Sequence, residues 1–296
     1  MRQAHSPWWL ENAASTPFTI LLIYLVLMLA LIYFISFQQC FIYLLANFIL
    51  ALCLNNLVTL SHSVIFNNNT CVDRITIFQF NIKYHAADDE LMPLIEHLIA
   101  EKYHLIALQG VSQQSKLQLI EHLSPHYPYF IRGESHRQQV FSDQLLFSRY
   151  AFTNINYYKN GHRSFLISSR WQLPFTTLSL HSLHPPSPRN DALWQIRNKT
   201  LYQLKDALKK STGKHSLVIG DLNLSTHSNR INTLRQGMNT KFVNSWPNKR
   251  YISPFFALAL DHLWVSKPAR ICARQRMNKF NWSDHYAIKT QLDFNE

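Results

Sequence analysis

A long apolar run near the amino terminus constrains this chain more than any other feature of its sequence. Phe18 to Phe37 (FTILLIYLVLMLALIYFISF) carries no charge and is long enough to cross a bilayer as a helix. After Gln38 and Gln39, a second apolar stretch runs from Cys40 to Leu60, although its asparagines make it a weaker candidate. We expect a transmembrane helical hairpin here. A cleaved signal peptide is the main alternative, but the first run is too long and the second follows at once.

Charge separates this apolar region from the rest of the chain. Apart from Arg2 and Glu11, which cancel, no charged side chain precedes Asp73, so the net charge of +12 belongs to the downstream part. We assign residues 1–66 to a membrane anchor with one or two transmembrane helices, residues 67–72 to a linker and residues 73–296 to one soluble domain. Its positive charge favours a polyanionic partner such as nucleic acid, a phosphorylated head group or the membrane surface. Solubility beside anionic lipid is the alternative explanation.

The side of the membrane on which this domain lies depends on how many runs span it. Arg2 and the amino terminus favour an inside start, which leaves the domain cytoplasmic if both runs cross and outward-facing if only the first crosses. Cysteines bear on the same question, because disulfides persist in oxidising compartments. Cys71 and Cys272 can pair, but we expect two inert buried thiols.

Hydrophobic periodicity divides the soluble domain into strands and helices. Alternating β-rich runs predict strands, and a three-to-four spacing of apolar residues predicts helices. The predicted helices cover Asp88–Lys102, Gln113–Leu123 and Asn190–Lys210. The predicted strands cover Arg74–Asn81, His104–Gln109, Val140–Phe147, Ser164–Ser169, Thr176–Ser182, His215–Gly220, Leu260–Val265, Ile271–Arg276 and Tyr286–Leu292. Strands that arrive singly and in pairs, with helices between some of them, indicate two packed sheets covered by helices.

Polar residues stand where several of these strands begin or end, which is where a rigid scaffold presents reactive groups. In chain order they are Asn81, Gln109-Gly110, His184, Asp221 with Asn223, Asp261-His262 and Asp284-His285. Each is a weak signal by itself, because turns and helix caps use the same residue types and short motifs match by chance. Their joint order is the stronger observation.

In this order the motifs resemble the signature of the endonuclease/exonuclease/phosphatase family, which includes abasic-site repair nucleases, neutral sphingomyelinases and inositol-polyphosphate phosphatases. That signature reads Asn, Leu-Gln-Glu, a His after a middle strand, Gly-Asp-x-Asn, Asp-His and Ser-Asp-His, and the resemblance spans Ile75 to Leu292. The stretch from His184 to Leu204 resembles a bacterial branch with amino-terminal transmembrane helices. The resemblance implies an α/β (α+β) fold, a four-layer α/β/β/α sandwich of two mixed sheets, in a bacterial inner membrane.

The resemblance also implies a metal-dependent phosphoester hydrolase of the phosphodiesterase or nuclease type. Asp221 would orient or deprotonate the attacking water, while Asn223 hydrogen-bonds the phosphate. His285 would contact the scissile phosphate, and Asp261 would orient this imidazole and keep it charged. The implied reaction is in-line attack of water on phosphorus.

The implied cofactor is Mg²⁺ or Mn²⁺, held by Asp284 with Asn81 and the Glu of the family signature. This chain has Gly110 in place of that Glu, so the site loses one of its carboxylates. Three outcomes are open: weak metal binding with reduced catalysis, a membrane-tethered binding protein without catalysis, or replacement by a carboxylate distant in sequence. The candidates for replacement are Asp88, Asp89 and Asp143.

Substrate recognition is the least constrained feature. The resemblance makes His184 a second phosphate ligand, with His181 as the alternative if the preceding strand ends sooner. Three segments that mix basic and aromatic residues are predicted recognition loops: Arg132–Gln139, Tyr157–Arg163 and Asn244–Tyr251. Such loops suit stacked bases or an interfacial head group. The expected substrate is therefore a nucleic acid, a phospholipid head group or a phosphoinositide.

Overall fold

The computed structural model describes residues 8–14, 17–32, 39, 42–47, 74–84, 88–249 and 257–294. Helix α1 (Trp8–Ala14) precedes helix α2 (Pro17–Ile32), which covers most of the first apolar run. Most of the second run lies outside the described residues. Among the described helices, none is both long and apolar enough to cross a membrane. The transmembrane hairpin therefore stays a prediction.

Six strands form the first of two mixed β-sheets. They are β1 Arg74–Asn81, β2 Leu105–Gln109, β3 Tyr129–Ile131, β6 Leu145–Ser148, β13 Arg270–Met277 and β14 Ala287–Asp293. Their spatial order is β13-β14-β1-β2-β6-β3. The central strand β1 is parallel to β2 and antiparallel to β14. Strand β2 is buried at every position, and its sequence LIALQ is apolar up to the final glutamine. Strand β1 alternates apolar and polar residues, although most of its side chains are buried.

The second sheet has eight strands. They are β4 Glu134–Ser135, β5 Val140–Phe141, β7 Phe152–Asn160, β8 Arg163–Gln172, β9 Thr177–Leu183, β10 His215–Asp221, β11 Met238–Thr240 and β12 Asp261–Ser266. The order is β11-β12-β10-β9-β8-β5-β4, with β7 paired to β8. Strands β9 and β10 are parallel, while β12 runs antiparallel to β10.

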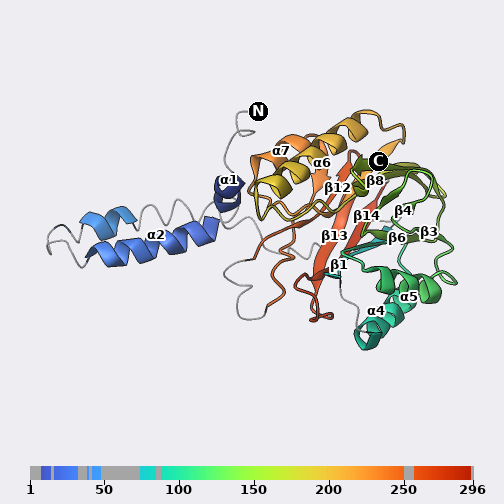
Figure 1. Ribbon diagram of the computed structural model, residues 1–296, viewed down its shortest axis with the longest axis horizontal. Coiled ribbons are helices and arrows are strands. Elements are labelled where there is room, and N and C mark those ends of the chain that lie inside the picture. Colours follow the sequence, from blue (N-terminus) through green and yellow to red (C-terminus); the bar gives the residue numbers. More distant parts are fainter. Residues whose placement is uncertain are drawn as a thin grey trace.

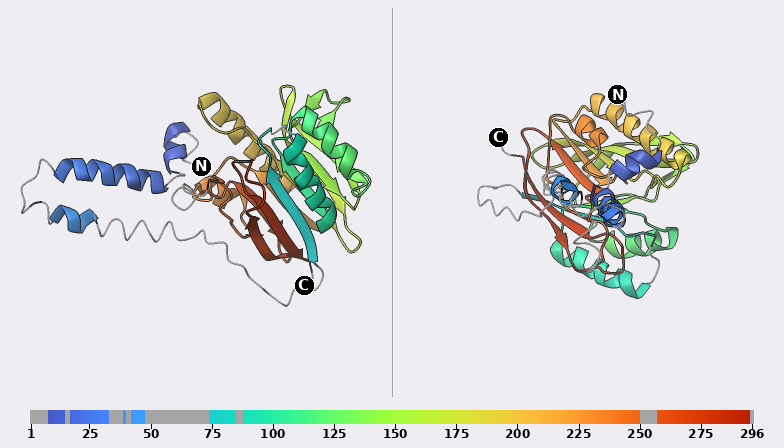
Figure 2. Two further views of the ribbon diagram at one scale, coloured as in Figure 1. Left: turned by 90° about the horizontal axis from the view of Figure 1, so that it is seen from below. Right: turned by 90° about the vertical axis from the view of Figure 1, so that its left-hand side faces the viewer.

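Helices cover the outer face of each sheet, as Figures 1 and 2 show. Helices α4 (Asp88–Glu101) and α5 (Gln113–Leu123) lie on the first sheet, and α6 (Asp191–Lys209) and α7 (Asn229–Leu234) lie on the second. Helix α5 begins where Ser112 accepts a hydrogen bond from Ser115 N–H, and α6 where Asn190 accepts one from Leu193 N–H. The prediction of two packed mixed sheets covered by helices is confirmed.

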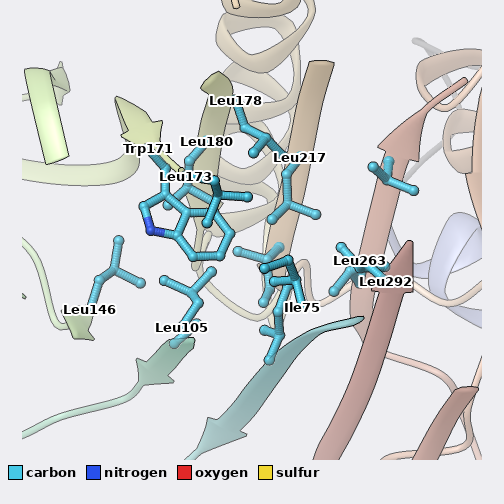
Figure 3. Packing of buried hydrophobic residues seen from close by; sticks show 14 of the residues in the cluster. Ile75, Leu105, Leu146, Trp171, Leu173, Leu178, Leu180, Leu217, Leu263 and Leu292 are labelled. Atoms are coloured by element: carbon cyan, nitrogen blue, oxygen red, sulfur yellow. The ribbon is translucent and has the colours of Figure 1, made fainter. Parts of the chain in front are cut away.

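A buried apolar layer joins the two sheets (Figure 3). Trp171 from β8 is fully buried there and faces Leu105 of β2, while Leu217 and Leu263 of the second sheet approach Ile75 of β1. Burial of side chains this large contributes about 1.5–3 kcal/mol each. This layer fixes the two sheets relative to each other, and thereby fixes the strand ends that carry polar residues.

The strand ends of both sheets meet at one edge of the sandwich. Asn81 and Gln109 pair at the ends of β1 and β2, and Asp221 pairs with Asp261 where β10 ends and β12 begins. Gly220, at φ 149°, lets β10 approach β9 closely, because a Cβ there would lie 1.8 Å from Leu183 O. The fold therefore gathers residues that are widely separated in sequence.

Several local predictions were wrong. The predicted strand Val140–Phe147 is two strands, β5 in one sheet and β6 in the other. The predicted loop Tyr157–Arg163 belongs mostly to the hairpin of β7 and β8. Strand β7 escaped prediction because it is an outer strand with mostly exposed side chains and no regular apolar alternation. Cys272 is disulfide-bonded rather than a free thiol, and Cys71 lies outside the described residues.

Helix α1 contacts the domain formed by the two sheets, although its sequence lies in the predicted membrane anchor. It lies beside α6 and α7 in Figures 1 and 2. Glu11 forms ion pairs with Arg197 of α6 at 3.0 Å and Arg230 of α7 at 2.7 Å, and Asn12 Nδ2 donates to Pro188 O at 2.7 Å. The segment before the apolar run is thus tied to the domain by buried charge.

Candidate active site

One imidazole lies between two buried carboxylates at the shared edge of the sheets. His285, just before β14, has its Nδ1 2.7 Å from Asp261 Oδ2 and its Nε2 3.6 Å from Asp221 Oδ2. Burial opposes protonation of this ring, but Asp261 and Asp221 outweigh it and raise the pKa of His285 to about 9. His285 therefore carries a positive charge at neutral pH. Asp261 in turn has a lowered pKa, because His285 offsets the effect of its burial.

A second imidazole approaches Asp221 from the end of β9. His184 Nε2 lies 3.9 Å from Asp221 Oδ2, while its Nδ1 forms an ion pair with Asp143 Oδ1 at 3.1 Å. Burial lowers the pKa of His184, but Asp143 outweighs burial and the net shift is upward. Asp143 is held by Tyr84, whose hydroxyl donates to its Oδ2, and by Arg163 at 4.0 Å. One oxygen of Asp143 thus holds His184, while the other is engaged by Tyr84 and Arg163.

Asp221 is the common neighbour of both imidazoles. Its Oδ2 accepts a hydrogen bond from Asn81 Nδ2 at 2.8 Å, and its Oδ1 accepts one from Asn223 N–H at 2.8 Å. Burial raises the pKa of this carboxyl, with the charge of Asp261 adding to the same direction. A buried carboxylate of raised pKa is a stronger base toward water than an exposed one.

Asp284 forms a separate charged pair on the more open side of the site. Its Oδ2 lies 2.8 Å from Lys83 Nζ and accepts a hydrogen bond from Trp246 Nε1 at 3.3 Å. Burial opposes ionisation of Asp284, but the Lys83 hydrogen bond outweighs it and lowers the pKa of this carboxyl. Trp246 belongs to the predicted Asn244–Tyr251 loop, so that loop does reach the site.

Gly110 adopts the left-handed conformation, with φ +62°, where β2 ends. A Cβ at this position would lie 2.6 Å from Asn81 Oδ1 and 3.0 Å from Lys83 N. The space beside Gly110 is therefore filled by the amide of Asn81 and the backbone of Lys83. A carboxylate side chain does not fit here unless the backbone of this turn moves.

The described residues do not fit a divalent cation in their present arrangement. Of the two expected ligands, Asn81 Oδ1 accepts a hydrogen bond from Lys83 N–H at 2.9 Å, and Asp284 Oδ2 is paired with Lys83 Nζ. Only Asp284 Oδ1, buried and without a hydrogen-bond partner in the described part of the chain, is left. One oxygen is too few for Mg²⁺, which needs octahedral oxygen coordination and usually one or two carboxylates.

Among the side chains that the structure describes, no other carboxylate replaces the missing ligand. Ligand atoms of Asp221, Asp261 and His285 lie within 4.8 Å of one another. His285, however, is protonated at neutral pH and directs both ring nitrogens at carboxylates, so it offers no lone pair to a metal. Asp143 is occupied by His184, and the side chains of Asp88 and Asp89 lie outside the described residues.

The structure brings together most of the residues that the sequence singled out. Asn81, His184, Asp221, Asn223, Asp261, Asp284 and His285 all lie at the same edge of the sandwich, linked by the contacts above. His181 does not: its ring contacts Ser168 Oγ and Ser211 Oγ, and burial lowers its pKa to about 4. His262 likewise lies against Leu224 O rather than in the site.

Four residues of the site were missed or misassigned by sequence reasoning. Asp143 was considered only as a metal ligand, and Lys83, Tyr84 and Trp246 were not singled out as site residues. Lys83 and Tyr84 directly follow the motif residue Asn81, and both take positive φ values, 50° and 57°, in a tight turn. Their position next to a motif was the available signal, but the turn that aims them into the site is not visible in the sequence.

The same residues fall within one known protein family. A profile described as the endonuclease/exonuclease/phosphatase family matches residues 78–285, which is more than half of the chain. The chain belongs to the endonuclease/exonuclease/phosphatase family. Members of this family are metal-dependent phosphoester hydrolases. No curated protein matches the sequence significantly.

Solved structures show the endonuclease/exonuclease/phosphatase fold at low sequence identity. An endonuclease/exonuclease/phosphatase from Beutenbergia cavernae has 15% identity and a TM-score of 0.58, covering 76% of this chain and 72% of that one. TDP2 from D. rerio, complexed with a single-strand DNA product, has 16% identity and a TM-score of 0.61, with coverage of 75% and 100%. Beta toxin from Staphylococcus aureus, with bound magnesium ions, has 14% identity and a TM-score of 0.59, with coverage of 74% and 99%.

Proposed function

We propose that this protein is a phosphodiester hydrolase. The observation that carries the proposal is the position of Asp221 Oδ2, which lies 3.6 Å from His285 Nε2 and 3.9 Å from His184 Nε2. Both distances are too long for a direct hydrogen bond, and a buried aspartate raises the pKa of each imidazole. A carboxylate base between two such imidazoles suits a water molecule beside a phosphoryl group.

Each residue then has a distinct task in the reaction. Asp221 accepts the proton of the attacking water, and the hydrogen bond from Asn81 fixes the direction of its carboxylate. His285 and His184 bind phosphoryl oxygens and stabilise the negative charge that grows on them. The side-chain amide of Asn223 donates to Pro185 O at 3.0 Å, so this residue positions the loop after His184 as well as Asp221.

The proposed roles of these residues do not include a bound magnesium or manganese ion, although the family implies one. A divalent cation, when bound in this family, neutralises phosphate charge and polarises the phosphoryl group. In this chain its binding depends on Asp284 and Asn81, which are both engaged with Lys83. A cation can therefore bind only if Lys83 moves away.

We further propose that the protein is anchored in a bacterial inner membrane by its apolar amino-terminal region. The length of the run from Phe18 to Phe37 supports the anchor. Helix α1 precedes this run, and Glu11 pairs with Arg197 and Arg230 of the domain. This contact needs α1 and the domain on the same side of the membrane, so it supports a hairpin of two spans rather than a single span.

A substrate screen on the full-length protein in detergent micelles tests the proposed function. The arms are bis(p-nitrophenyl) phosphate, single-stranded DNA, RNA, a choline phospholipid and a phosphoinositide, each with and without Mg²⁺ or Mn²⁺. We expect hydrolysis of at least the generic diester, and its absence in Asp221→Asn. If no arm shows turnover, the hydrolase proposal is wrong and the protein is better described as a tethered binding protein for phosphorylated ligands.

A further inference from the structure

We propose that the ammonium group of Lys83 takes the place of the divalent cation, so that phosphodiester hydrolysis by this protein needs no metal. This inference rests on the proposed function and concerns the same site. It starts from a contact that the family signature does not contain, the ion pair of 2.8 Å between Lys83 Nζ and Asp284 Oδ2.

Lys83 is fixed by the turn that ends β1. Its backbone N–H donates to Asn81 Oδ1 at 2.9 Å, and the next residue, Tyr84, donates its N–H to Gly110 O. Both Lys83 and Tyr84 have positive φ, so the chain reverses sharply and stays against β2. The same turn brings the Tyr84 hydroxyl to Asp143. The fold therefore sets the backbone position of Lys83, and the ion pair with Asp284 directs its ammonium group to the site.

The turn that contains Lys83 leaves no room for a carboxylate side chain at position 110. A Cβ on Gly110 would lie 3.0 Å from Lys83 N and 3.3 Å from Lys83 Cα. Contacts this close show that the backbone of Lys83 occupies the space a side chain at 110 would enter. The backbone that excludes a side chain at position 110 thus also carries the lysine whose ammonium group reaches Asp284.

Charge balance supports the exchange. In the family arrangement, two carboxylates face a cation of charge +2, whereas here Asp284 alone faces the single charge of Lys83. Both arrangements are neutral before the phosphate binds. Trp246 Nε1 donates to the same oxygen of Asp284 at 3.3 Å, which holds the carboxylate in place under the ammonium. An exposed lysine–aspartate pair usually contributes little to the free energy of folding. The role we propose for the Lys83–Asp284 pair is therefore to hold the ammonium group at the site.

The ammonium lies on the open side of the site. The Lys83 side chain is 61% exposed, compared with 23% for Asp284. It is therefore accessible to an incoming phosphate, while its partner stays half-buried. Lysine is a common phosphate ligand and acts as a point charge.

The reaction balances without a metal. The water oxygen forms a bond to phosphorus as its proton passes to Asp221. The phosphorus–oxygen bond to the leaving group breaks, its electron pair goes to the leaving oxygen, and that oxygen takes a proton from solvent. Lys83, His184 and His285 stabilise the charge on the phosphoryl oxygens throughout.

The test compares the full-length protein with Lys83→Met and Lys83→Arg, all stripped of metal with EDTA. Hydrolysis of bis(p-nitrophenyl) phosphate is measured in EDTA and with added Mg²⁺, and Mn²⁺ binding is followed separately by electron paramagnetic resonance. Lys209→Met, at an exposed position at the end of α6, is the matched control. Melting temperatures show whether each variant is folded.

We expect wild-type turnover in EDTA to stay within about twofold of that with Mg²⁺. Lys83→Met should lose about 100-fold in EDTA, the usual effect of removing one group that stabilises the transition state. Added Mg²⁺ should restore part of this loss, because Asp284 is then free, and Lys83→Arg should retain more activity in EDTA than Lys83→Met. Mn²⁺ should bind Lys83→Met but not the wild type.

Two results overturn the inference while leaving the proposed function intact. One is wild-type hydrolysis that disappears in EDTA and returns with Mg²⁺, together with Mn²⁺ binding by the wild type. The other is a hydrolysis rate in EDTA that is the same for folded Lys83→Met as for the wild type. Absence of hydrolysis under all conditions refutes the proposed function, and the inference with it.

Discussion

His285 Nε2 lies 3.6 Å from Asp221 Oδ2, while the other nitrogen of the same ring lies 2.7 Å from Asp261 Oδ2. One imidazole thus links the two antiparallel strands β10 and β12, whose ends carry the two aspartates, to the segment before β14. The two carboxylates keep the ring charged, and the longer distance leaves Asp221 able to act on water. The reaction we propose depends on this difference between the two distances.

The charge on His285 predicts a defined pH dependence. Its pKa is raised to about 9 by Asp261, Asp221 and Asp284 against the effect of burial, so turnover should fall as pH rises through about 9. Because the folded-state pKa lies above the unfolded value, the stability it contributes is fully present below about pH 6.5 and is lost as pH rises through about 9. Melting temperature against pH measures this, and the decline should be shallower in His285→Gln. An equal decline in both proteins contradicts the assignment.

Asp143 should control the protonation of His184. Burial alone lowers the pKa of His184, and the Asp143 carboxylate reverses that shift. In Asp143→Asn we therefore expect the pKa of His184, followed by NMR, to fall below its ordinary value and turnover at neutral pH to fall about 100-fold. Asp206→Asn, at an exposed position of α6, is the control and should leave both unchanged. An unaltered His184 titration in Asp143→Asn would show that this pair does not set its charge.

The sequence predicts the strand ends of the site better than it predicts the side-chain pairs within it. The strand ends that carry Asn81, Asp221 and Asp261 follow from alternation and from the order of the motifs, and α5 has its predicted bounds because Ser112 caps it. Local sequence patterns do not predict which side chains distant in sequence pair with each other. The contacts of Lys83 with Asp284, and of Asp143 with His184, depend on how the sheets and turns meet in three dimensions.

The contact of helix α1 with the domain is another feature that the sequence does not predict. Glu11 is isolated in the sequence beside an apolar region, and only the folded chain shows that it pairs with Arg197, whose side chain is 1% exposed. Arg197 also donates to Asn223 O at 3.3 Å, which connects this contact to the loop that holds Asp221. The amino-terminal segment is therefore part of the catalytic domain's structure as well as the predicted route to the membrane.

Removal of the charge on Glu11 should destabilise the protein. In Glu11→Gln the buried guanidinium of Arg197 loses its carboxylate partner, an effect of about 3 kcal/mol. For a chain of this size that corresponds to a fall of roughly 6–12 °C in melting temperature. The exposed Glu121→Gln is the matched control and should change the melting temperature by less than about 2 °C. Equal melting temperatures for Glu11→Gln and the wild type would show that α1 is not held by this contact.

Gly110 and Gly161 offer a matched pair for the crowded turn. Both have positive φ, +62° and +64°, but a Cβ on Gly161 meets nothing within 4 Å, whereas one on Gly110 lies 2.6 Å from Asn81 Oδ1. Gly161→Ala should cost about 1 kcal/mol from backbone strain alone. Gly110→Ala should cost more and should also reduce turnover, because it displaces the amide that orients Asp221. If thermal unfolding shows equal losses for the two variants, the space beside Gly110 is not filled as described.

The most direct measurement is the hydrolysis rate of a generic phosphodiester by the full-length protein and by Asp221→Asn. The substitution keeps the shape of the side chain but removes the base, so we predict a loss of about 1000-fold with little change in melting temperature. His181→Gln, which alters a buried histidine away from the site, should stay close to the wild-type rate if it folds. A folded Asp221→Asn protein that hydrolyses the diester within about threefold of the wild type would contradict the account.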